Sequence, residues 1–228
     1  MKKRLSPRIY ILLSVTLFSL AVTWIDAVVH PSYFAKIPVK ILFFLALPLL
    51  FFALCRRERP ELRRLFHFEK KGLLLSLGLG LAVYALIVGG YFLTRHIFDF
   101  SAVTTSLTSG MGITAENFPW VAFYITMGNS FLEEFFFRGF GFITLKKYLP
   151  GPAGWLFSPV LFALYHGGMM FGMFHPFLLF LLLAGLVAGG LLFNALNARF
   201  GNLFPSWCVH MAADAAIMTV GAILFGLL

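Results

Sequence analysis

The chain contains few charged residues and almost no cysteine. Charged side chains make up 12% of its 228 residues, and only nine residues are acidic. Hydrophobic residues make up 60% of the sequence, and several apolar runs approach or exceed the ~20 residues that cross a bilayer. This composition excludes a soluble globular protein and indicates a polytopic membrane protein.

The two cysteines, Cys55 and Cys208, lie within or at the end of apolar runs. Two such residues make a disulfide framework untenable, and without a CxxC motif there is no cysteine-based metal site. We expect both to be small buried hydrophobic residues. The sequence also contains no internal repeat and no low-complexity segment.

Positive charge is concentrated in the short segments between the apolar runs. A net charge of +9 can suggest nucleic acid, but the longest basic segment, residues 56–72, separates two apolar runs. This placement is typical of loops that orient membrane proteins and contact lipid headgroups. We therefore expect the lipid bilayer, and no nucleic acid, as a partner.

The apolar runs predict an all-α bundle of about seven transmembrane helices, which form a single membrane domain over residues 1–228. The predicted spans are residues 9–29, 39–55, 73–93, 119–145, 153–173, 177–196 and 203–228. The first three helices and an external loop with a Ser/Thr/Gly-rich centre at residues 101–114 make up an N-terminal region, residues 1–117.

The distribution of lysine and arginine predicts the orientation of this bundle. If the N-terminus is cytoplasmic, the inner segments carry fourteen basic residues, including those among residues 1–8, and the outer segments carry Lys36, Lys40 and Arg95. This bias predicts a cytoplasmic N-terminus and an external C-terminus. We expect a multi-pass protein of the cell's plasma or inner membrane.

The stretch FLEEFFFRG, residues 131–139, places three charges in an otherwise apolar helix. A charge at the centre of a spanning helix costs about 2.5 to 3.5 kcal/mol, so each one must be paired or have a function. Glu134 and Arg138 share one helical stripe at i, i+4 and can form an ion pair, whereas Glu133 projects elsewhere and is the candidate reactive carboxylate. The alternative is a charge cluster that only joins two helices.

Other polar groups lie at compatible depths on other predicted helices. At 1.5 Å of rise per residue, Glu133, His166 and His210 lie roughly 20, 20 and 10 Å from the predicted cytoplasmic ends. Asp214 follows His210 by one turn, and Asn129 precedes Glu133 by one turn, where it can hydrogen-bond within the site. A base, a partner for its proton and donors to an oxyanion are the groups that activate water for hydrolysis.

Three motifs occur in order on successive predicted helices: E-E-x-x-x-R at residues 133–138, F-x-x-x-H at 162–166 and H-x-x-x-N/D at 210–214. Together they resemble the CAAX prenyl protease type II and bacteriocin-processing family, known as CPBP or ABI, of intramembrane endopeptidases. The resemblance implies that residues 118–228 form the catalytic core.

The resemblance also implies a role for each motif residue. Glu133 corresponds to the general base that activates water and His166 to its partner, while Glu134 and Arg138 correspond to supporting residues. His210 and the residue at position 214 correspond to the groups that stabilise the oxyanion. Position 214 is Asp here instead of the more familiar Asn. An ionised carboxylate donates no hydrogen bond, so Asp214 either acts in its protonated form or orients His210.

A metal is the alternative to this glutamate-water chemistry. The family's older label is metalloprotease, and Glu133, His166, His210 and Asp214 are residue types that bind zinc. However, the sequence contains no H-E-x-x-H motif, and the mechanism implied by the family needs no metal. We therefore expect no cofactor, with a divalent metal such as zinc as the alternative.

The predicted function is hydrolysis of a peptide bond in a membrane-anchored protein or peptide. One alternative is a non-catalytic family member that acts as a membrane scaffold or bacteriocin-immunity protein. A second is an ion-coupled transporter, because intramembrane Glu, His and Asp also mark ion pathways. The sequence lacks the paired halves with matching broken helices that usually indicate such a transporter.

Overall fold

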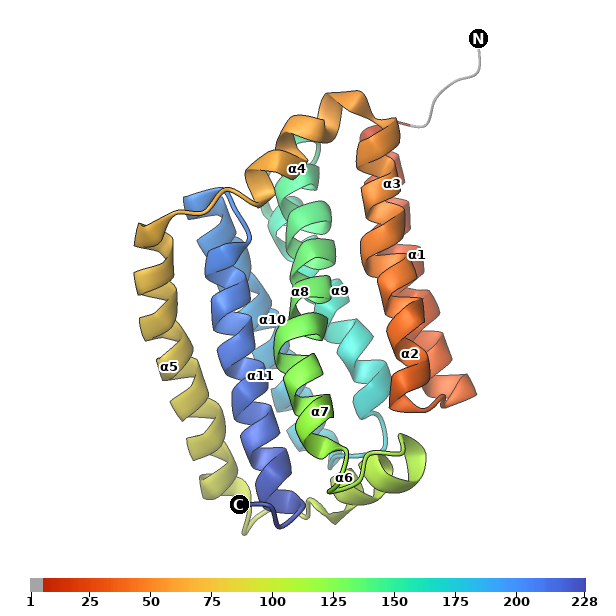
Figure 1. Ribbon diagram of the computed structural model, residues 1–228, viewed down its shortest axis with the longest axis vertical. Helices are drawn as coiled ribbons and strands as arrows, with labels where there is room; N and C mark the ends of the chain where they lie inside the picture. The colour runs from red at the N-terminus through yellow and green to blue at the C-terminus, as the bar shows by residue number, and fades with distance from the viewer. Residues whose placement is uncertain (1–5) are drawn as a thin grey trace.

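The protein is a bundle of long helices that run along roughly the same axis (Figure 1). The computed structural model describes residues 6–228, and over this range the chain forms helices and no strand. Segments labelled η are π-helical, except η3 and η7, which are 3₁₀-helical. Most π segments continue directly from an α-helix, so several consecutive segments form one continuous helix, which we call a rod.

The first half of the chain contributes three rods and two short helical pairs. The rods are α1 (Pro7–Trp24) with η1 (Ile25–Val29), then α2 (Tyr33–Lys40) with η2 (Ile41–Ala46) and α3 (Leu47–Leu54), and finally α5 (Lys70–Thr94). The short pairs are η3 (Arg56–Glu58) with α4 (Arg59–Leu65), and α6 (Ser101–Thr105) with η4 (Ser106–Gly110). In Figure 1, α4 lies across the end of the bundle nearest the N-terminus, and α6 lies at the opposite end.

The second half of the chain contributes four rods. The first is continuous through α7 (Phe118–Phe123), η5 (Tyr124–Asn129), α8 (Ser130–Glu133), η6 (Glu134–Thr144) and η7 (Leu145–Lys147). It is followed by α9 (Pro152–Met170), α10 (Pro176–Phe200) and α11 (Phe204–Leu224). The rod from α7 to η7 runs up the middle of the view in Figure 1, with α11 beside it.

The prediction of an all-α polytopic bundle is confirmed. Within residues 6–228, five stretches have the length and hydropathy to cross a membrane: Pro7–Val29, Tyr33–Leu54, Lys70–Thr94, Pro176–Phe200 and Phe204–Leu224. The other two predicted spans, residues 119–145 and 153–173, fall on the rod from α7 to η7 and on α9. The orientation stays a prediction, and the basic residues among residues 1–5 that support it lie outside the described residues.

The second rod begins earlier than the hydropathy predicts. It starts at Tyr33, not at residue 39, so Lys36 as well as Lys40 lies inside the helix, and both are buried. The Lys36 ammonium lies 2.8 Å from the Asp26 carboxylate at the end of the first rod. Because a buried charge is tolerated when it is paired, this lysine does not end the apolar segment.

The segment between residues 94 and 118 is also more regular than expected. Its Ser/Thr/Gly-rich centre, residues 101–114, was predicted to be a loop, but residues 101–110 form α6 and η4. Threonine hydroxyls donate to backbone carbonyls one turn earlier, as Thr105 does to Ser101 and Thr108 does to Thr104. These local bonds let a polar segment wind into a short helix at the end of the bundle.

Glu58 connects the segment before α4 to the end of the central rod. Its buried carboxylate accepts hydrogen bonds from Lys147, at 2.7 Å, and from the hydroxyl of Tyr148. Burial by itself raises the pKa of Glu58, but these two bonds outweigh it and hold the pKa below its ordinary value. Burial and the bond to Glu58 in turn raise the pKa of Tyr148 to about 12.

The lowered pKa of Glu58 predicts a loss of stability in acid. A carboxyl group whose folded-state pKa is depressed stabilises the fold above its unfolded pKa of about 4.3, and this contribution disappears as the pH falls through the folded-state value. We expect wild-type protein in detergent to unfold at a higher temperature than Glu58→Gln at pH 7, and the difference to shrink below about pH 4. Thermal unfolding measured across this range checks it. A difference that grows in acid contradicts the assignment.

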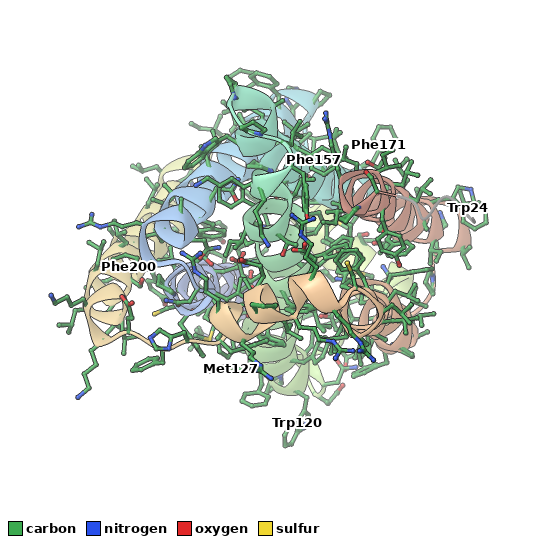
Figure 2. The ribbon with its side chains drawn as sticks, turned by 90° about the horizontal axis from the view of Figure 1, so that it is seen from above. Trp24, Trp120, Met127, Phe157, Phe171 and Phe200 are labelled. Atoms are coloured by element: carbon green, nitrogen blue, oxygen red, sulfur yellow. The ribbon has the colours of Figure 1, made fainter. Side chains whose placement is uncertain are left out.

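Aromatic side chains fill the interior beside the central rod. Phe135, Phe136, Phe137 and Phe140 are fully buried, and the ring of Phe136 stacks on Phe44 of the second rod at 4.2 Å between centroids. In Figure 2, by contrast, the labelled Trp24, Trp120 and Phe171 lie on the periphery of the bundle, and each is more than half exposed. Apolar side chains on this outer surface are what lipid requires.

Candidate active site

The predicted catalytic residues come together from separate helices in the bundle interior. The central rod supplies Glu133 and Glu134, α9 supplies His166, and α11 supplies His210 and Asp214. The rod is π-helical on both sides of the short segment α8, in η5 and η6. Such π-helical segments are frequent at functional sites.

One oxygen of Glu133 is firmly held. Its Oε1 atom accepts a hydrogen bond from the Asn129 amide at 2.8 Å and one from the Tyr165 hydroxyl at 3.1 Å. The ammonium of Lys40 lies 3.4 Å from the same oxygen, and donates to Oδ1 of Asn129 at 2.7 Å. Three donors from three helices therefore fix the orientation of a carboxylate that is 1% exposed.

The other oxygen of Glu133 has no hydrogen bond and faces two imidazoles. Its Oε2 atom lies 3.6 Å from Nε2 of His166 and 3.8 Å from Nε2 of His210, and among the described residues it has no partner. These separations are too long for direct hydrogen bonds, and a bridging water is the usual way to join such groups. The carboxylate is thus anchored through one oxygen, while the other has no hydrogen bond within the described residues.

His166 is oriented by its own helix. Its Nδ1 atom lies 2.8 Å from the carbonyl oxygen of Phe162, one turn earlier. A carbonyl can only accept, so Nδ1 carries the proton, and in the neutral ring Nε2 is left as an acceptor that points toward Glu133. Phe162 of the F-x-x-x-H motif therefore contacts His166 in two ways. Its backbone carbonyl accepts from Nδ1, and its ring packs on the imidazole.

Glu134 orients His210. Its Oε1 atom lies 3.0 Å from Nδ1 of His210, and since a carboxylate accepts, this bond places the proton of Nδ1 toward Glu134. Asp214 lies on the other side of the ring, with Oδ1 3.7 Å from Nε2, which is beyond hydrogen-bond distance. The group that orients His210 is therefore Glu134, and Asp214 keeps an oxygen, Oδ2, without a partner within residues 6–228.

Arg138 pairs with Glu134, as the i, i+4 spacing predicts. Its Nε atom lies 3.4 Å from Oε1 of Glu134, and both side chains are fully buried. The guanidinium lies 4.0 Å from the centroid of the Phe162 ring and 4.9 Å from that of Phe193. A Cβ atom at Gly190 would lie 2.8 Å from Pro159 and 3.3 Å from Nη2 of Arg138, so glycine here lets α10 approach both.

The structure adds two residues that the sequence does not reveal as part of the site, Lys40 and Tyr165. Lys40 was counted only among the basic residues of the outer side, although Lys36 and Lys40 stand at the i, i+4 spacing of a helix. Tyr165 is adjacent to His166 and looks like ordinary aromatic packing. Only the arrangement of helices brings both to Glu133, with the Lys40 ammonium also 5.2 Å from the Tyr165 ring centroid.

The residues at the centre do not form an evident metal site. Within the part of the chain that the structure describes, no group of three or more His, Cys, Asp or Glu side chains is arranged to hold a metal ion. The Lys40 ammonium is already 3.4 Å from Glu133, where it provides the positive charge that the carboxylate needs. The expectation that the site needs no metal stays a prediction.

A family comparison agrees with the motifs. Residues 115–216 match the family described as type II CAAX prenyl endopeptidase Rce1-like. The matched segment contains all three motifs, from Glu133 to Asp214, and it confirms the resemblance that they predict. Lys40 lies outside it. Neither a curated protein nor a solved structure matches the chain.

Proposed function

We propose that this chain, of which residues 115–216 match the Rce1-like family of type II CAAX prenyl endopeptidases, hydrolyses a peptide bond in a membrane-anchored protein or peptide. One observation carries the proposal. Glu133 is held through Oε1 by three donors, while its Oε2 is unbonded and faces the Nε2 atoms of His166 and His210. A positioned base beside two imidazoles is the arrangement for activating water.

In the proposed reaction, a water molecule lies between Oε2 of Glu133 and Nε2 of His166. Glu133 takes a proton from this water as its oxygen attacks the carbonyl carbon of the peptide. His210 acts in its doubly protonated form: Nδ1 donates to Glu134, and Nε2 donates to the resulting oxyanion. The tetrahedral intermediate collapses with breakage of the C–N bond, and Glu133, assisted by His166, returns the proton to the leaving amine.

Asp214 has a smaller part in this scheme than the resemblance implies. Its Oδ1 atom is 3.7 Å from Nε2 of His210, so a hydrogen bond between them needs a small shift of either side chain. In its ionised form Asp214 supports the positive charge of His210, and in its protonated form it donates to the oxyanion as Asn does. The reaction needs no metal in either case.

Lys40 is proposed as a positioning residue for Glu133. Its ammonium stabilises the carboxylate inside a low-dielectric bundle and, through Asn129, fixes the oxygen that does not react. Replacement by methionine keeps an unbranched side chain one atom shorter and removes the charge. We expect kcat to fall about 10- to 100-fold, with KM little changed, because the base is misplaced while the substrate surface is intact.

The Lys40 prediction is checked by comparing wild type with Lys40→Met and Lys40→Arg. Arginine retains the charge and the donors, so it should recover part of kcat, which a purely structural role of the lysine would not explain. Lys71→Met, at an exposed position, is the matched control. An unchanged kcat for a folded Lys40→Met protein would refute the positioning role.

The proposed activity is tested with purified protein in proteoliposomes. The substrates are two membrane-anchored peptides with the same C-terminal sequence, one farnesylated at a CaaX cysteine and one attached by an unrelated lipid. Release of a C-terminal fragment, resistant to a zinc chelator, is the expected result, and the pair of substrates shows whether the prenyl group is required. Absence of cleavage of any anchored peptide favours the scaffold alternative.

A further inference from the structure

A polar cavity lies away from Glu133, at the end of the bundle where α4 crosses. It has a volume of about 380 Å³, within the usual range for small-ligand sites. Its polar wall comes from three elements: α4 supplies Glu61 and Arg64, η7 supplies Lys146 and Lys147, and α10 supplies Asn197. The catalytic proposal uses none of these residues.

The cavity carries uncompensated positive charge. Lys147 pairs with Glu58 at 2.7 Å and with Glu61 at 3.1 Å, so the acidic residue of the wall is already neutralised. Within residues 6–228, Arg64 and Lys146 form no ion pair. The ammonium of Lys146 instead lies 5.5 Å from the ring centroid of Trp155. Two cations without an ion-pair partner among the described residues thus line the cavity.

The position of Arg64 depends on a glycine. Gly201, the residue after α10, has a left-handed φ of 71° and lines the cavity. A Cβ atom there would lie 2.7 Å from Nη2 and 2.9 Å from Nε of Arg64, too close for a real contact. Glycine therefore lets the guanidinium lie directly against the backbone at the end of α10.

Asn197 provides an independent indication of a ligand. The side chain is fully buried and lines the cavity, yet neither its oxygen nor its nitrogen has a hydrogen-bond partner among the described residues. Buried amides in proteins are nearly always hydrogen-bonded, and an unmet one usually indicates an absent ion, water or ligand. A ligand that brings hydrogen-bonding oxygens would satisfy it.

We propose that this cavity binds the phosphate headgroup of an anionic phospholipid. Phosphate oxygens match a guanidinium and an ammonium that lack other partners. The site lies at the ends of α10 and the central rod, where headgroups meet a spanning bundle, and Phe142, Ile143 and Ala198 give it an apolar side for the acyl chains. A phosphate free in solution would gain nothing from that apolar side, which favours the lipid as the source.

The proposal is tested by binding of tail-labelled phosphatidylglycerol and phosphatidylcholine to the full-length protein in detergent. We expect wild type to prefer phosphatidylglycerol. The double variant Arg64→Gln/Lys146→Gln should lose on the order of tenfold in affinity, because each basic group near the headgroup contributes to attraction. Arg63→Gln/Lys71→Gln removes the same charge from exposed positions outside the cavity and should change the affinity less than about twofold.

Three results would overturn the proposal. The first is equal affinity of the wild type for the two lipids, and the second is an equal loss in both double variants, which would indicate diffuse charge attraction. The third is displacement of the labelled lipid by soluble glycerol 3-phosphate at equal concentration, which would assign the site to a free phosphate. Thermal unfolding of both variants confirms that they are folded. Because binding is measured without any peptide substrate, the outcome is independent of the proteolytic activity.

Discussion

Replacement of Glu133 by glutamine should lower kcat for peptide cleavage about 100- to 10,000-fold, the range expected when a general base is removed. Glutamine has nearly the same shape and retains one oxygen, which can still accept from Asn129 and Tyr165. Its amide nitrogen would then face His166 and His210, and an amide cannot take a proton from water. The loss should therefore appear in the chemical step and leave binding of the substrate almost unchanged.

The matched control for this variant is Glu69→Gln. Glu69 is exposed at the start of α5 and lies in none of the contacts around the site, so its neutralisation should leave activity unchanged. Both variants are compared with wild type in single-turnover cleavage and in thermal unfolding. A folded Glu133→Gln protein that cleaves at the wild-type rate would eliminate the proposed mechanism, and with it the assignment of the free Oε2 atom as the base.

Replacement of Arg138 by methionine should destabilise the protein by about 3 to 5 kcal/mol. The substitution leaves the Glu134 carboxylate buried without its 3.4 Å partner and removes a guanidinium that packs between Phe162 and Phe193. An unpaired buried charge costs much more than the pair contributes. Glu134 also holds His210, so activity should decline together with stability.

A double variant separates the charge effect from the packing effect. In Arg138→Met/Glu134→Gln no ionised group of the pair is left, and we expect part of the lost stability to return, so that the two substitutions are not additive. Unfolding in detergent, with Arg63→Gln as an exposed control, measures this coupling. If the double variant loses the sum of the two single effects, the ion pair does not explain the destabilisation.

The prediction of paired and reactive carboxylates rests on local geometry. Glu134 and Arg138 are four residues apart on one helix, so their approach is fixed by helical rise and turn, whatever surrounds them. Asn129 reaches Glu133 for the same reason. The hydropathy likewise predicts the rods, except at the start of the second rod, which contains Lys36 and Lys40. A hydropathy scale assigns each charged residue the same cost whether or not it is paired, so it does not recognise paired lysines inside a helix.

The contacts between helices could not be predicted in this way. Lys40 meets Glu133 from 93 positions earlier, and Glu134 meets His210 from 76 positions earlier. Each contact depends on the rotation of one helix against another, which is decided by close packing such as that of Phe44 on Phe136. The resemblance correctly brings the three motifs together, but it does not say which carboxylate orients His210.

The sequence by itself determined that this chain spans a membrane several times and that Glu133, Glu134 and Arg138 need partners, because lipid imposes a length on each apolar run and a cost on each charge. Only the tertiary structure decided which partners they have. It placed Lys40 and Tyr165 on one oxygen of Glu133, left the other oxygen facing His166 and His210, and gathered Arg64 and Lys146 around a separate cavity. Such arrangements depend on how side chains of distant segments pack, and that information is spread over the whole chain.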